Sequence, residues 1–313
     1  MQPKTKNPKP PVKDAAKILC YVGGVLLSGA LLAPPLFWAV QSVIARGVLT
    51  NLAHYDFDSY FHRAILIAAL LLLWPLLRSL RIHGWRGLGL EKNPRFFSDL
   101  GAGFAIAAVP LFCVGAILLA LPFYSLRHPF LWGKLPAILG AVAVVPLLEE
   151  LLFRAFILGV LLRSCTRISA LLLTSALFSI VHFLKTPALS VPNESVSWFS
   201  GFISLAHSFW QFGDPLLVAG GFLTLFAVGC ILADARLLTR SLALSIGLHA
   251  GWIFANGLFS KAAHREMSWL PWIGKDLLFG IVPLSIALLS WALMRGWVNY
   301  GHARTDAIAS RTG

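Results

Sequence analysis

Long apolar segments recur along this chain, and they constrain its fold more than any other feature. Most are close to the length of about 20 residues that crosses a bilayer as a helix. Of the 313 residues, 58% are hydrophobic and only 12% are charged. The sequence predicts an all-α polytopic membrane bundle of about eight transmembrane helices. It excludes a disordered chain, a coiled coil and an ordinary cytosolic enzyme. The predicted spans are roughly 18–44, 63–80, 99–124, 136–162, 168–185, 215–235, 241–259 and 277–298.

The spans follow one another with few long gaps, so we expect one membrane-embedded domain over residues 18–299. A Lys- and Pro-rich cytoplasmic tail, 1–17, precedes it, and a C-terminal cytoplasmic tail, 300–313, follows it. The longest loop, about 186–214, is rich in aromatic residues. It is expected to hold a short amphipathic helix at the membrane interface.

The net charge of +13 comes from basic residues that flank the apolar spans. With the N-terminus inside, inner segments hold about twice as many Lys and Arg residues as outer ones, as the positive-inside rule requires. The chain is therefore expected to be N-in and C-in, in a bacterial inner membrane more than in an organelle membrane. Its partners are the lipid bilayer and a protein or peptide substrate, with no nucleic acid. The four cysteines form no CxxC pair, which argues against a disulfide framework or a cysteine-ligated zinc site.

Ionisable side chains inside spans are costly and usually functional. One of them, Asp234, ends the sixth span beside Arg236 and is interpreted as a helix-end charge. The candidates that pass this filter are Glu149, Glu150, Arg154, His182, Asp234 and His249.

The two adjacent glutamates have different local surroundings. Glu150 and Arg154 are four residues apart, so they share a helix face and can pair. Glu149 points about 100° away and has no such partner, which leaves its carboxylate available as a general base for water. Pro146, just before them, is expected to bend or interrupt the span. The alternative is an ion-pair network that only ties helices together.

Two histidines on later spans complete the constellation. Phe178 and His182 are four residues apart and lie on one face of the fifth span. His249 is flanked by Gly247 and Gly251, which would let another backbone or a substrate approach closely. Either histidine alone is more typical of a polar contact, but two glutamates and two histidines on three spans together indicate a site.

This arrangement resembles the CPBP family of intramembrane endopeptidases, the CAAX proteases and bacteriocin-processing enzymes, also called the Abi family. The family pattern is EExxxR on one span, FxxxH on the next and a later histidine. Here the pattern is Glu149-Glu150-x-x-x-Arg154, then Phe178-x-x-x-His182, then His249. The resemblance covers roughly residues 136–259, the motif core, and the span count also looks like the family.

The resemblance implies the role of each residue. Glu149 would be the general base, His182 its partner in activating a water, and His249 a stabiliser of the tetrahedral oxyanion. Glu150 and Arg154 would form the supporting pair, with Phe178 beside them. Many family members carry an asparagine four residues after the last histidine, where this chain has Ile253, so that role is carried to Asn256.

The sequence leaves both the cofactor and the function open. Glu149, His182 and His249 could bind Zn as three ligands with one open position. We favour a metal-free site without a cofactor, because no HExxH is present and no second-shell acceptor for His182 can be identified. The alternative functions are a transporter or proton-relay protein that uses the same Glu/His cluster, and a catalytically silent scaffold. The expected substrates are CAAX-type prenylated tails, leader peptides or sorting signals of membrane-associated proteins.

Overall fold

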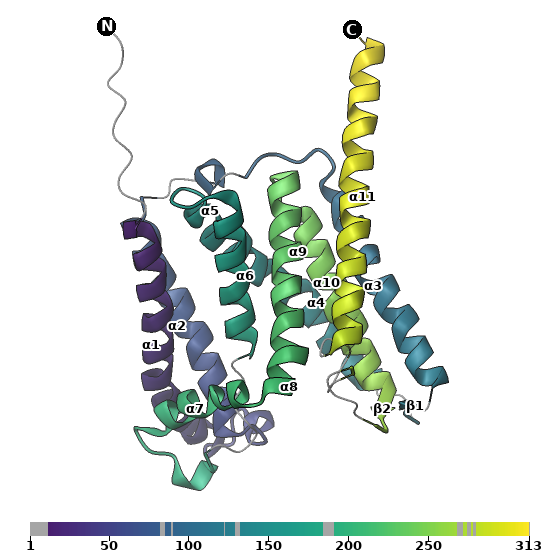
Figure 1. Ribbon diagram of the computed structural model, residues 1–313. Helices are drawn as coiled ribbons and strands as arrows, with labels where there is room; N and C mark the ends of the chain where they lie inside the picture. Colours follow the sequence, from purple (N-terminus) through teal and green to yellow (C-terminus); the bar gives the residue numbers. More distant parts are fainter. Residues whose placement is uncertain are drawn as a thin grey trace, which may run out of the picture. The chain divides into compact units, whose positions relative to one another are not determined.

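The computed structural model describes residues 12–81, 85–88, 90–121, 123–128, 132–183, 191–267, 272–273, 277 and 280–312. Within this part, the chain is almost entirely helical, with one two-stranded sheet (Figure 1). Six helices of the described part are long and apolar enough to cross a membrane. The predicted all-α membrane fold is therefore confirmed. The six stretches are Ala16–Ile44, Phe57–Ser79, Phe96–Ala120, Trp132–Leu161, Val218–Thr239 and Ile281–Gly301.

The remaining two predicted spans are also helices, but of a different character. α6 (Arg167–Phe183) is apolar yet has only 17 residues. α10 (Ala243–Ala262) has 20 residues, the length of a span, but His249 and Asn256 lower its hydropathy. These two helices, one short and the other less apolar, carry both candidate histidines.

The chain divides into two compact units. The first contains the described residues up to 81 together with 191–214. In its core, Phe37 of α1 makes edge-to-face contacts with Phe57 and Tyr60 of α2. The expected short helix in the long loop is α7, whose Ser204 donates a hydrogen bond to the buried Asp58. The first residues of the tail, 1–11, and residues 186–190 of the loop lie outside the described part. The elements are α1 (Val12–Ile44), η1 (Thr50–Leu52), α2 (Phe57–Ser79), η5 (Asn193–Ser195), α7 (Ser200–Ser208) and η6 (Trp210–Gly213).

The second unit holds the motif residues. Two of its segments, η4 and η7, are π-helices, and the short strands β1 and β2 pair antiparallel. Its elements are η2 (Trp85–Leu88), α3 (Phe96–Ala120), β1 (Tyr124–Leu126), η3 (Trp132–Lys134), α4 (Leu135–Glu150), η4 (Leu151–Ile157), α5 (Leu158–Leu161), α6, α8 (Pro215–Leu217), η7 (Val218–Phe222), α9 (Leu223–Thr239), α10, β2 (Ala263–Arg265) and α11 (Ile281–Thr312).

α3 and α10 pack backbone against backbone through glycines. A Cβ atom at Gly247 would collide with the backbone of Leu100, and one at Gly251 would collide with the backbone of Phe104. Gly103 of α3 makes the reciprocal approach to α10. The close neighbour that the flanking glycines predicted is thus α3, and it fixes the position of His249 from both sides.

Two carboxylates attach α11 to the unit. Asp234 of α9 accepts hydrogen bonds from Trp291 Nε1 (2.8 Å) and Arg295 Nε (2.9 Å). Asp99 of α3 accepts one from Trp297 Nε1 at 2.9 Å. Asp234 therefore pairs with Trp291 and Arg295 of α11, and not with the neighbouring Arg236. α11 also continues to Thr312 where the sequence predicted a tail, because the residues after Gly301 include no helix-breaking Pro or Gly before that point.

Candidate active site

The two motif glutamates lie where the fourth apolar segment changes its helical pattern. α4 runs through Pro146 without a break and ends at Glu150, where the seven-residue π-helix η4 begins. Half of the residues of α4 are exposed, whereas every residue from Phe153 to Leu161 is buried. The glutamates therefore lie where the chain enters the core of the unit, and π-helical segments are frequent at functional sites.

Glu150 and Arg154 form the predicted ion pair. Arg154 Nη1 lies 3.0 Å from Glu150 Oε1, and neither side chain has any exposed surface. Arg154 also donates to the carbonyl oxygen of Gly229 at 3.4 Å, and its Cζ atom lies 4.3 Å from the ring centroid of Phe178. This arginine is therefore fixed by contacts from α6 and α9 as well as by its own helix.

Glu150 has a second partner that the sequence did not reveal. His249 Nδ1 lies 3.0 Å from Glu150 Oε1, the same oxygen that faces Arg154. A carboxylate paired with an arginine is an acceptor, so Nδ1 of His249 carries the proton of this hydrogen bond. Glu150 thereby sets both the orientation and the tautomer of His249.

Glu149 faces the other nitrogen of both histidines. Its Oε2 lies 3.0 Å from His182 Nε2 and 3.7 Å from His249 Nε2. The structure thus brings Glu149 and His182 into direct contact. The side chains of Glu149 and His182 are 26% and 27% exposed, whereas that of Glu150 has no exposed surface. Although it is close to both rings, Oε2 has no aligned hydrogen-bond donor among the described residues.

The orientation of His182 is set by the motif phenylalanine. His182 Nδ1 lies 2.9 Å from the carbonyl oxygen of Phe178, which can only accept, so Nδ1 donates. The two rings are also stacked, with centroids 4.1 Å apart. The four-residue spacing thus turns Nε2 of His182 toward Glu149.

Asn256 is not brought into contact with this cluster by any described interaction. It lies on α10 two turns beyond His249, about 10 Å along the helix axis. Its Oδ1 is buried without a hydrogen-bond partner among the described residues. Its part in an oxyanion site stays a prediction.

No group of three or more His, Cys, Asp or Glu side chains in the described ranges is arranged to hold a metal ion. One sequence argument against zinc, the lack of a second-shell acceptor for His182, is nevertheless wrong. The Phe178 carbonyl is an acceptor for His182, and Glu150 is an acceptor for His249, so both histidines have the outer partner that metal ligands use.

Two described clefts lie away from this cluster. One lies between α6, α9 and α11, and the other lies in the first unit between α1 and α2. Neither is lined by Glu149 or His182.

Fold and site together define a multi-pass helical membrane protein with a Glu/His cluster inside its helices. Residues 131–255 match the sequence model of the Rce1-like family, described as type II CAAX prenyl endopeptidase Rce1-like. This match confirms the resemblance to the CPBP family and supports a CAAX-type intramembrane endopeptidase in general. It gives no support to the transporter alternative. The matched segment contains both glutamates, Arg154, Phe178 and both histidines, and it ends one residue before Asn256.

The chain matched none of the curated proteins and none of the solved structures with which it was compared.

Proposed function

We propose that this protein hydrolyses peptide bonds of membrane-associated protein substrates with a water activated by Glu149 and His182. The observation that carries the proposal is that the two adjacent carboxylates differ in their partners and in their exposure to solvent. Glu150 is paired with Arg154 and has no exposed surface, while the side chain of Glu149 is 26% exposed and turns Oε2 toward two imidazole nitrogens. That arrangement suits a general base, whereas an ion-pair network would need no partly exposed member.

The proposed reaction begins with a water between Glu149 and the scissile carbonyl. Glu149 takes one proton, and the oxygen attacks the carbonyl carbon, whose own oxygen becomes an anion. His249 Nε2 donates a hydrogen bond to that anion. Collapse of the intermediate breaks the C–N bond, and the proton held by Glu149 and His182 passes to the leaving amine.

The hydrogen bonds to Nδ1 support this assignment of roles. Each histidine already uses its Nδ1 proton, so its Nε2 can donate only when the ring is an imidazolium. Glu150 holds the ring of His249 in one tautomer and orientation, as the carboxylate of a catalytic triad does for its histidine. His182, held by a neutral carbonyl, is better suited to exchanging a proton with Glu149.

The substrates are proposed to be CAAX-type prenylated tails, leader peptides or sorting signals. The family description names a prenyl endopeptidase, and Glu149 lies within an apolar span, so the scissile bond must reach into the bilayer region. N-in and C-in orientation in a bacterial inner membrane is part of the same proposal. Whether Asn256 adds a second oxyanion donor is tested separately by its replacement with Ala.

Glu149→Gln is expected to abolish cleavage of a membrane-anchored peptide while the protein stays folded. It removes the base but keeps the shape of the side chain, and general-base catalysis contributes about 10²–10⁴-fold in rate. The measurement is product formation by mass spectrometry, beside size-exclusion profiles of the solubilised protein. The matched control is Glu194→Gln, an exposed glutamate outside the motif region, which should keep full activity. Retained cleavage in Glu149→Gln would refute the mechanism.

A metal-free reaction makes a second prediction. Dialysis against a strong chelator should leave activity intact, and elemental analysis of active protein should find far less than one zinc per chain. If activity falls and added zinc restores it, then Glu149, His182 and His249 are ligands and the glutamate-only mechanism is wrong.

A further inference from the structure

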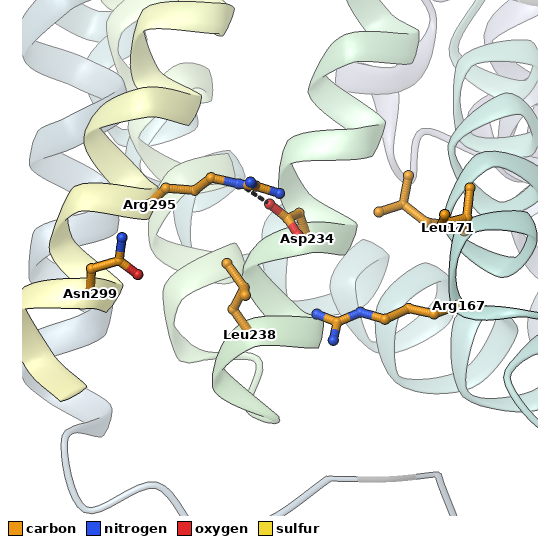
Figure 2. Close-up of a pocket in the computed structure, with 7 residues that line it drawn as sticks. Arg167, Leu171, Asp234, Leu238, Arg295 and Asn299 are labelled. Atoms are coloured by element: carbon orange, nitrogen blue, oxygen red, sulfur yellow. Dashed lines mark hydrogen bonds and ion pairs between the residues drawn. The ribbon is translucent and has the colours of Figure 1, made fainter.

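A cleft of about 300 Å³ opens between α6, α9 and α11 in the second unit, apart from the Glu/His cluster. Figure 2 shows Arg167 entering it from α6, Asp234 from α9, and Arg295 and Asn299 from α11. The volume is at the lower end of the range of about 300–1,000 Å³ that small-ligand sites occupy. The cleft is large enough for a polar headgroup.

The charges in this cleft favour an anion. The carboxylate of Asp234 is already engaged by Trp291 and by Nε of Arg295, so it holds that arginine in place. Arg167 has no hydrogen bond or ion pair among the described residues. The guanidinium groups of Arg167 and Arg295 therefore outnumber the single carboxylate of Asp234, which already has its hydrogen-bond donors. The cleft has a net positive charge and N–H donors that can bind a ligand.

The position of the cleft along the helices corresponds to a membrane surface. Arg167 is the first residue of α6, Leu238 is the last but one of α9, and Asn299 lies two residues before the end of the apolar stretch of α11. All three helix ends are flanked by the basic residues that the charge bias predicts to be cytoplasmic. An anion at this depth is at the level of lipid headgroups.

Apolar surface continues from the cleft along α6. Ile168, which lines the cleft, is 71% exposed, and Leu172, one turn further and on the same face, is 43% exposed. A ligand with a phosphate at one end and hydrocarbon at the other would satisfy both features. A free phosphate would use only the arginines.

We propose that this cleft binds the phosphate headgroup of an anionic phospholipid, with Arg167 as the principal contact and Arg295, positioned by Asp234, as the second. Basic pockets between transmembrane helices near the cytoplasmic surface are suited to such headgroups. The site is independent of peptide hydrolysis and can be measured in the Glu149→Gln protein, so its failure and that of the proposed function are distinguishable.

The test is a titration of the solubilised full-length protein with short-chain phosphatidylglycerol or phosphatidylcholine, followed by native mass spectrometry. We expect tighter binding of phosphatidylglycerol and a weakening of about fivefold in Arg167→Gln, from about 1 kcal/mol per basic residue. Arg167 is exposed and unpaired, so its replacement should leave the fold intact. The matched control is Arg163→Gln, which removes an exposed charge four residues away but does not line the cleft.

Four outcomes would overturn the proposal. Equal binding of the two lipids would exclude headgroup selectivity, and equal losses in the two variants would show a diffuse surface charge. If inorganic phosphate displaces bound phosphatidylglycerol as effectively as added phosphatidylglycerol does, the site binds a free anion. Displacement by a peptide with a free carboxylate, but not by its amide, would assign it to the substrate.

Discussion

One oxygen atom, Oε1 of Glu150, lies 3.0 Å from Arg154 Nη1 and 3.0 Å from His249 Nδ1. Since charge-assisted hydrogen bonds are shorter and stronger than neutral ones, this atom joins the π-helical segment to α10. Removing Arg154 would leave a carboxylate with no exposed surface and only an imidazole beside it. The burial of the pair, more than its distance, should decide what the interaction contributes to stability.

Arg154→Met is expected to lower the free energy of unfolding by about 3–5 kcal/mol, because Glu150 is left as an uncompensated buried charge. The measurement is thermal or denaturant unfolding in detergent. Adding Glu150→Gln should restore most of the lost unfolding free energy, since it removes the buried charge of Glu150.

The control for this prediction is Arg240→Met. Arg240 pairs with Glu91 at 2.8 Å, but the two side chains are 67% and 60% exposed. Exposed pairs contribute only about 0–1 kcal/mol, so this variant should be nearly neutral. Equal losses in Arg154→Met and Arg240→Met would contradict a structural role for the buried pair.

Local spacing explains which site contacts the sequence could predict. Four-residue separations predicted the pairing of Glu150 with Arg154 and the shared face of Phe178 and His182. The bond from His249 to Glu150 joins residues 99 positions apart, and no helical period encodes it. The pairing of His182 with Glu149 was expected only from the family resemblance.

Among the elements, α10 depends on glycine more than on apolar side chains. Gly247→Ala is expected to destabilise the protein by about 1–3 kcal/mol, because the new methyl group meets the backbone of Leu100 and cannot be accommodated by a rotamer change. The measurement is again unfolding in detergent. Peptidase activity should fall together with stability in Gly247→Ala, since His249 lies two residues away.

Gly140→Ala is the matched control. Gly140 lies on α4, and a Cβ atom there would have nothing within 4 Å. The substitution should therefore be neutral or slightly stabilising, by up to about 1 kcal/mol from helix propensity. Destabilisation of both variants to the same extent would mean that the loss does not come from the α3–α10 contact.

The helical elements were predictable to different degrees. Apolar length located the spans, and α6 and α10 stand apart because they contain polar residues and are shorter or less apolar. The π-helix η4 was not predictable, since Leu151–Ile157 has the composition of an ordinary apolar helix. Pro146 was expected to cause the interruption, but α4 passes through it and the pattern changes only at Leu151.

At the scale of the whole molecule, the charge bias predicts which side each loop occupies. In a variant without the four native cysteines, Ser195→Cys should react with an impermeant maleimide added outside intact cells. Lys92→Cys should react only after permeabilisation, because its loop is expected inside. Both positions are exposed, so accessibility of the residue itself is matched. Labelling in the reverse order would invert the proposed topology.

The attachment of α11 bears on the order in which the protein is assembled. α11 follows every other described helix of the second unit, so a ribosome synthesises it after them. Until it inserts, Asp234 lacks both Trp291 and Arg295, its two hydrogen-bond donors. A nascent chain that ends before Trp291 would therefore hold this carboxylate without either donor, and ionisable groups within spans are costly unless they are paired. We expect docking of α11 to be the step that completes the hydrogen bonding of α9.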